Sequence, residues 1–110
     1  MTVLTAPAQL AEKLTTAERF HRLAAEWKQE SLYLSNLRQA AMLPSYQRII
    51  GMGLPVVPLI LEDLARDPVP WFWALEAITE ANPVPPDVNG DMKRITEAWL
   101  DWGRREGLLV

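Results

Sequence analysis

Apolar residues recur at helical spacing along most of the chain, and proline or glycine separates one such run from the next. The first clear run follows Thr15 and places four apolar side chains at i, i+3, i+4 and i+7. They are Phe20, Leu23, Ala24 and Trp27. Thr15 and Glu18 have the spacing of a capping box, in which each side chain bonds the backbone amide of the other residue. The pattern therefore predicts an amphipathic helix that begins just after Thr15.

Weaker patterns on either side of this helix predict further short helices. Residues 1–6 show no pattern and are expected to be a flexible end. The additional helices are expected over 7–14, over 31–43 with a break near Ser35 and Asn36, and over 45–52. Pro44 can open the last of these at its first position. Gly51-Met52-Gly53 is expected to end it, since glycine adopts the left-handed conformation that follows many helices.

The most apolar part of the chain, residues 54–78, predicts two antiparallel helices with the core of the domain between them. The expected buried stripe of the first helix consists of Val56, Leu59, Ile60 and Leu64. Glu62 and Asp63 are expected to face water. Pro68 and Pro70 end this helix and shape the turn, because proline cannot continue a helix interior.

A proline-rich segment, 82–89, separates this pair from one more amphipathic helix. The segment is expected to be a stiff, extended loop. The last helix is expected over about 91–105, with Asp91 as its cap and Gly107 just beyond its end. Its apolar face consists of Met92, Ile95, Ala98, Trp99 and Trp102. We expect Trp99 and Trp102, three positions apart, to share one face in the core.

Gly53 to Leu64, a turn that contains proline, and Trp71 to Ile78 together resemble one HEAT-like repeat. The resemblance implies a helix pair that binds a protein partner. It also implies that the remaining helices act as caps, because a solenoid normally needs at least about three repeats. Trp71 and Trp73 depart from the family, whose second helix usually carries small residues and arginine at these positions. The wider sequence, including 46–53 and 99–103, is similar to a group of small bacterial helical proteins, and that similarity implies no activity.

Composition limits the classes of function. The chain has 110 residues, of which 49% are hydrophobic, and this fits one helical domain, expected over 7–110. The absence of cysteine excludes disulfides, thiol catalysis and zinc–thiolate sites. The net charge of −3 disfavours a nucleic-acid binder, which needs a clustered basic face. No apolar run approaches the ~20 residues of a membrane span, and the N-terminus does not resemble a signal peptide. A cytoplasmic protein with no membrane contact is therefore expected.

Residues that could carry catalysis or hold a metal ion are scattered along the chain. His21 is the only histidine. Glu62 and Asp63 are adjacent on a predicted helix, so their side chains diverge. The segment 87–91 lacks the glutamate that a calcium loop needs at its twelfth position. The segment 51–53 lacks the preceding strand and the third glycine of a dinucleotide site. We therefore expect no catalytic residue, no metal and no cofactor.

Tryptophan is the unusual feature of the composition, with five in 110 residues. Trp71 and Trp73 point about 200° apart on a helix, so both cannot face one core. One interpretation places one indole in the core and packs the other under the proline-rich loop. The other interpretation leaves one indole on the surface as the anchor for a protein partner, a role in which tryptophan, tyrosine and arginine are enriched. Trp71 and Trp73 are therefore candidate partner-binding residues, and Tyr46 and Arg48 are the next candidates.

The sequence thus predicts an all-α protein of about five helices, organised around a HEAT-like antiparallel pair with capping helices. The expected function is that of a non-enzymatic protein–protein interaction module, such as an adaptor or a small subunit of a bacterial complex. The alternative is an antitoxin-type or regulatory protein that contacts a toxin or nucleic acid. An enzyme is disfavoured because no convergent set of polar residues is apparent.

Overall fold

The computed structural model describes residues 15–88 and 90–109, and this part of the chain contains helices and loops but no strand. The α-helices are α2 (Thr16–Ser31), α3 (Leu37–Ala41), α4 (Pro44–Met52), α5 (Val57–Arg66), α6 (Phe72–Thr79) and α7 (Met92–Arg105). Two 3₁₀ helices accompany them, η1 (Leu54–Val56) and η2 (Pro86–Val88). The all-α prediction is confirmed. The expected helix at 7–14 and the expected flexible end at 1–6 lie outside the described residues.

Side chains close the starts of the first two described helices, at Thr15 as the sequence predicts and at Asn36, where no cap was predicted. Thr15 Oγ1 accepts a hydrogen bond from the Glu18 amide at 3.0 Å, and Glu18 Oε1 accepts one from the Thr15 amide at 2.9 Å. Asn36 Oδ1 accepts one from the Arg38 amide at 2.9 Å, and α3 begins directly after Asn36, where a break was expected. Residues 32–36 are not helical, so the helix expected over 31–43 is limited to α3. These amides lack partners within their helices, so the capping side chains fix where α2 and α3 begin.

Proline and glycine set the connection between α4 and α5. Pro44 lies in the first turn of α4, and Gly53 follows the end of that helix with a φ of 78°. Because glycine has no Cβ, it adopts this left-handed φ without strain, and the chain turns directly into η1 and α5. Pro58 lies in the first turn of α5, where a missing N–H is of little consequence. All three positions agree with the sequence prediction.

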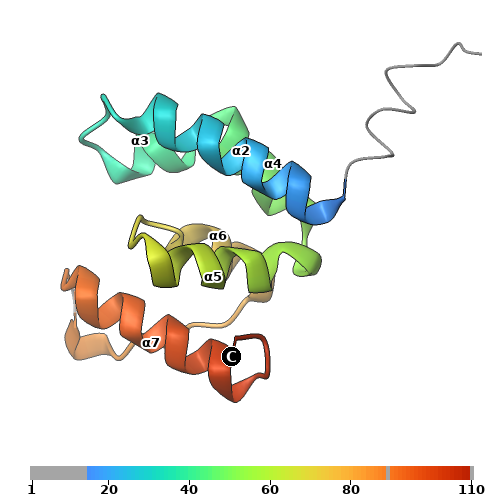
Figure 1. Ribbon diagram of the computed structural model, residues 1–110. Helices are drawn as coiled ribbons and strands as arrows, with labels where there is room; N and C mark the ends of the chain where they lie inside the picture. Colours follow the sequence, from blue (N-terminus) through green and yellow to red (C-terminus); the bar gives the residue numbers. More distant parts are fainter. Residues whose placement is uncertain (1–14, 89, 110) are drawn as a thin grey trace, which may run out of the picture.

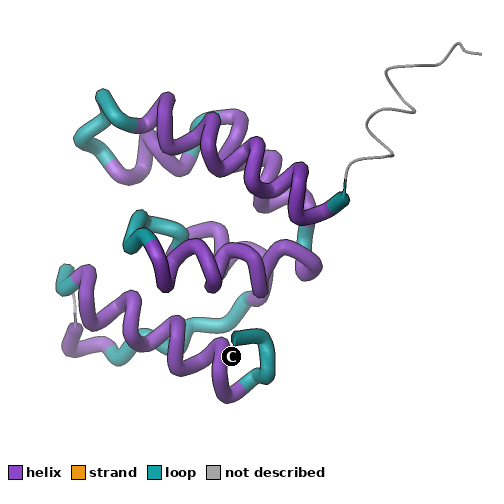
Figure 2. Tube along the Cα trace, in the orientation of Figure 1, coloured by secondary structure: helices purple, strands orange, loops and turns teal. Residues whose placement is uncertain are grey.

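Figure 1 shows the helices in three tiers, with α2, α3 and α4 in the first, α5 and α6 in the second and α7 in the third. Figure 1 shows α5 with α6 behind it, and these two helices run antiparallel, as predicted. α2 packs on α4, α4 packs on α6, and α5 packs on both α6 and α7. The proline-rich loop passes behind α7 (Figure 2). The central pair is thus covered by α4 on one side and by α7 on the other.

The sequence suggested a core within the central pair. The aromatic part of the core lies instead between α2, α4 and α6. Phe20 and Trp27 from α2, Tyr46 from α4 and Trp71 at the start of α6 are each at most 1% exposed. The ring centroid of Trp71 lies 4.7 Å from Trp27, 5.5 Å from Tyr46 and 5.7 Å from Phe20. Aromatic pairs at such separations stabilise a fold beyond the area that they bury. We call these four residues the aromatic core.

Hydrogen bonds from the aromatic core reach the backbone of two other segments. The Trp27 indole N–H donates to the Ala40 carbonyl at 2.8 Å. The Tyr46 hydroxyl donates to the Pro70 carbonyl and accepts from the Ala74 amide, both at 3.0 Å. Buried polar groups are costly without partners, so these bonds fix α3 and the start of α6 against the aromatic core.

Asp63 is buried, with 6% exposure, although the sequence predicts that it faces water beside Glu62. Its Oδ2 accepts the indole N–H of Trp71 at 2.7 Å. The Lys28 ammonium lies 2.8 Å from the same oxygen and 3.1 Å from the Asp67 carboxylate. A carboxylate is costly to bury unless it is paired and hydrogen-bonded, and these two partners meet that condition. The prediction was wrong because Trp71 and Lys28 lie 8 and 35 positions away in the sequence.

The contact between α5 and α7 explains a second difference between the predicted and the observed buried residues of α5. Val56, Ile60 and Leu64 are buried as predicted, whereas Leu59 is only partly buried and Leu61 is fully buried. Leu61 fits against Gly103 of α7, where a Cβ atom would lie 2.7 Å from Leu61 Cδ1. Trp99 is buried as predicted, and Trp102 beside it is half-buried. α5 therefore buries apolar side chains on two sides, one of them against α7.

Replacing Asp63 with alanine should destabilise the fold, whereas the same change at the neighbouring Glu62 should not. Asp63→Ala leaves the buried indole N–H of Trp71 without an acceptor, which costs about 1–3 kcal/mol. Glu62→Ala truncates an exposed side chain and should change the free energy of unfolding by less than about 0.5 kcal/mol. Urea melts of the two variants measure the difference, and equal losses would contradict the buried position of Asp63.

Candidate interaction surface

The four candidate partner-binding residues lie in different environments. Trp71 and Tyr46 have no exposed surface, so the prediction that they contact a partner is corrected, and both belong to the aromatic core. Arg48 is exposed on α4 but does not line any of the hollows around Trp73. Trp73, on α6, is 43% exposed and has apolar neighbours. Of the four, Trp73 is the one that a partner could use as an apolar anchor.

Trp73 is exposed because Trp71 is buried. The two side chains point about 200° apart on a helix. Trp71 turns into the aromatic core and bonds Asp63, so Trp73 turns to the other side of α6. The loop residues Asn82 and Val84 line the same hollow as Trp73, yet the indole remains 43% exposed. The proline-rich loop therefore borders this indole without covering it, and part of the Trp73 indole lies on the surface.

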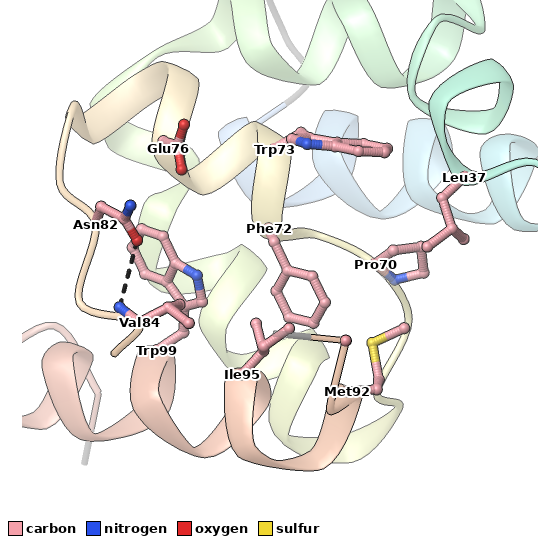
Figure 3. Close-up of a pocket in the computed structure, with 11 residues that line it drawn as sticks. Leu37, Pro70, Phe72, Trp73, Glu76, Asn82, Val84, Met92, Ile95 and Trp99 are labelled. Carbon is pink, nitrogen blue, oxygen red and sulfur yellow. Dashed lines mark hydrogen bonds between the residues drawn. The ribbon is translucent and has the colours of Figure 1, made fainter. Parts of the chain in front are cut away.

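An apolar hollow of about 480 Å³ lies on one side of Trp73 (Figure 3). Phe72 points into it from α6, and Ile95 and Trp99 face it from α7. Leu37 of α3 lies at the end of the hollow away from Trp99. The other side chains that border it are those of Pro70, Glu76, Asn82, Val84 and Met92. Four parts of the chain thus form one largely apolar recess beside Trp73.

Two further hollows continue this first one. A hollow of about 520 Å³ between α4 and α6 shares Trp73 and Glu76 with the first hollow. A third, of about 440 Å³, lies beside the end of α2 and shares Leu37 and Pro70 with the first. We call the three linked hollows and their rims the Trp73 face. Its exposed apolar side chains are Leu32, Leu37, Met42, Trp73 and Met92.

Exposed apolar side chains are concentrated on the Trp73 face. Among the described residues seven large apolar side chains are exposed, and five of them line this face. The other two are Tyr33 and Leu54. Single exposed apolar residues are normal on a monomer, but a contiguous apolar surface marks an interaction site. The concentration, rather than any one residue, identifies this face as the candidate site.

Sequence reasoning found Trp73 but not its neighbours on the face. Met92 fits the apolar side of the last helix, and no signal in the sequence distinguishes it from a core residue. Leu37 and Met42 belong to the segment 31–43, where the helical pattern is weak. The face combines side chains from α2, α3, α4, α6 and α7, and the periodicity of a single helix does not report such an arrangement.

Two charged groups, one positive and one negative, border the second hollow. Arg38 from α3 and Glu76 from α6 both line it, and both are exposed. Neither forms an ion pair within residues 15–88 and 90–109. At the third hollow, by contrast, Lys28 is paired with Asp67 at 3.1 Å. The Trp73 face is therefore an apolar surface with one positive and one negative group available to a partner.

Groups that could support other chemistry are separated in the structure. No three His, Cys, Asp or Glu side chains of the described residues gather where they could hold a metal ion. His21 is exposed, with its ring edge-on to Phe20 at a centroid distance of 5.4 Å. In the same part of the chain, none of the helices has both the length and the apolar character that crossing a bilayer requires.

Comparison with known proteins assigns no family to the chain. No protein-family model matches it, and neither a curated protein nor a solved structure shows significant similarity to it. The HEAT-like repeat at 53–78 therefore stays a prediction. The function has to be inferred from the Trp73 face itself.

The fold should lose stability above about pH 10, in part through Tyr46. Burial raises the pKa of Tyr46 well above the ordinary value of 10.0, an effect that outweighs the hydrogen bond from the Ala74 amide. Because the pKa is higher in the folded state, the stabilisation is complete below the unfolded-state pKa and is lost as the pH rises toward the folded-state pKa. Burial lowers the pKa of Lys28, but its bonds to Asp63 and Asp67 outweigh burial and raise it overall. Deprotonation of Lys28 at high pH therefore also lowers the stability of the fold.

Urea melts of the parent and of Tyr46→Phe at about pH 8 and about pH 11 separate the tyrosine contribution. Tyr46→Phe loses two buried hydrogen bonds and should be less stable at the lower pH by about 1–3 kcal/mol. It should then lose less additional stability than the parent between the two pH values. Equal additional losses would show that Tyr46 does not act as a buried phenol.

Proposed function

We propose that this protein is a non-enzymatic protein–protein interaction module, an adaptor or small subunit of a bacterial complex, which binds its partner through the Trp73 face. One observation carries the proposal. Five of the seven exposed large apolar side chains of the described residues surround one set of linked hollows, with Trp73 between two of them. Tryptophan is enriched among the few residues that supply most of the binding free energy of protein interfaces.

The backbone around this anchor is held in place by the aromatic core beneath it. The Tyr46 hydroxyl bonds Pro70 and Ala74, which flank Trp73 in the sequence. Trp71, two positions before the anchor, is bonded to Asp63. A backbone that is fixed before binding loses little conformational entropy on association, so more of the interaction free energy remains as affinity.

The charge distribution of the Trp73 face favours a protein partner over a nucleic acid. The second hollow carries one arginine and one glutamate, which is not the basic stripe that phosphate recognition needs. An apolar centre with few charged groups is typical of the buried part of protein interfaces. A cytoplasmic location belongs to the same proposal, and the cysteine-free sequence is compatible with it.

The proposal includes a HEAT-like arrangement of α5 and α6, capped by their neighbouring helices. The antiparallel direction of α5 and α6 supports it (Figure 1). The packing of α4 on α6 and of α7 on α5 also supports it, since capping helices would occupy those positions. HEAT-type modules bind protein partners, which agrees with the function proposed for the Trp73 face.

Trp73→Ala should weaken partner binding and leave the fold intact. Truncation of an indole at the centre of an interface can remove about 2 kcal/mol or more of binding free energy. The matched control is Leu54→Ala, which truncates an apolar side chain of 67% exposure outside the face. The tagged parent captures the partner from a bacterial lysate, and mass spectrometry identifies it. Calorimetry then compares binding, and circular dichroism compares the melts.

The expected result is binding weaker by about tenfold or more for Trp73→Ala, with parental binding for Leu54→Ala and parental melts for both. If Trp73→Ala folds and binds like the parent, the interface lies elsewhere and the proposal fails. Retention of the parent on heparin at moderate salt, unchanged by Trp73→Ala, would instead indicate the nucleic-acid-binding alternative.

A further inference from the structure

Arg38 and Glu76 give the Trp73 face both signs of charge in one place. Both are exposed at the second hollow, and neither has an ion-pair partner within the described ranges 15–88 and 90–109. A surface with one available cation and one available anion can be complementary to a copy of itself. About a two-fold axis, the cation of each copy then faces the anion of the other.

We propose that the Trp73 face binds a second copy of this chain, so that the protein forms a two-fold symmetric dimer. This inference rests on the proposed function: the proposed function assigns a protein partner to the Trp73 face, and the inference says which protein that partner is. In the dimer the guanidinium of Arg38 in each copy pairs with the carboxylate of Glu76 in the other. A different protein that uses the same face would have to displace the second copy.

The shape of the face supports the same occupant. Trp73 separates two hollows of about 480 and 520 Å³, so a partly exposed indole and an apolar recess lie side by side on one surface. A two-fold axis close to Trp73 brings the indole of each copy to a recess of the other. An aromatic side chain enclosed in a desolvated pocket near the interface centre is the usual form of a binding hot spot.

The proposed dimer uses the whole Trp73 face rather than a single hollow. A stable protein interface buries about 800 Å² on each partner. One hollow is too small for this, so the interface would have to include all three hollows and their rims. The apolar side chains supply the buried area. The charged pairs at the border fix the register and orientation of the two copies more than the affinity.

A nucleic acid or a uniformly basic peptide satisfies only one of the two charges. A nucleic acid over the second hollow would bring its phosphates to the carboxylate of Glu76, and a basic peptide would bring its cations to the guanidinium of Arg38. Like charges brought together across an interface are strongly unfavourable. A partner must therefore present both signs in the opposite order, and a second copy does so by symmetry.

Sedimentation equilibrium of the full chain over a range of concentrations tests the dimer. Arg38→Glu and Glu76→Arg each place like charges opposite one another, so each single variant should weaken the dimer about tenfold or more. The double variant reverses both charges and should restore parental dimerisation. Trp73→Ala should weaken the dimer, whereas Leu54→Ala, outside the face, should not. Circular dichroism melts establish that each variant is folded.

A parent that sediments as a monomer at every concentration would overturn the dimer. So would a folded double variant that remains as weak as the single variants, since a two-fold charge pairing requires the rescue. Either result leaves the proposed function standing if capture of a different protein still depends on Trp73. If folded Trp73→Ala changes neither dimerisation nor that capture, the inference and the proposed function both fail.

Discussion

The hydrogen bond from the Trp71 indole to the Asp63 carboxylate is the constraint on which the rest of the structure depends. It joins the start of α6 to α5, and the ion pair of Asp63 with Lys28 extends the connection to α2. The ring of Trp71 meanwhile contacts the other three members of the aromatic core, from α2 and α4. A charge-assisted bond is stronger than a neutral one, and its removal would leave polar groups unpaired in the core. The side chain of Trp71 thus helps to fix the relative positions of α2, α4, α5 and α6.

This buried arrangement also determines what the surface can do. α6 spans only Phe72–Thr79, and so short a helix is not stable on its own in water. Its position is imposed by Trp71 on one side and by the Tyr46 hydroxyl, which bonds the backbone at Pro70 and Ala74. With the start of α6 fixed in this way, the indole of Trp73 can only turn away from the aromatic core. The stability of the core and the presentation of the Trp73 face therefore have the same physical origin.

Local features of the fold could be predicted from the sequence, and features that depend on distant residues could not. The capping box at Thr15 and the left-handed turn at Gly53 are decided by neighbouring residues, so both were predicted correctly. The burial of Asp63 depends on Trp71 and Lys28, which a helical pattern around residue 63 does not show. The sequence does not show the burial of Tyr46 for the same reason, since the partners of its hydroxyl lie 24 and 28 positions away. Periodicity separated the two neighbouring indoles, but only the packing decides which one is buried.

Exchange of the tryptophan indole N–H protons with deuterated solvent, followed by NMR, tests the central claim most directly. Single Trp→Phe variants assign the signals of Trp71 and Trp73. We predict that the Trp71 indole proton exchanges only through global opening, as slowly as the slowest backbone amides. The Trp73 indole proton should exchange at once in solutions dilute enough to keep the protein monomeric. A Trp71 proton that exchanges as fast as that of Trp73 would contradict a buried bond to Asp63 as the centre of this fold.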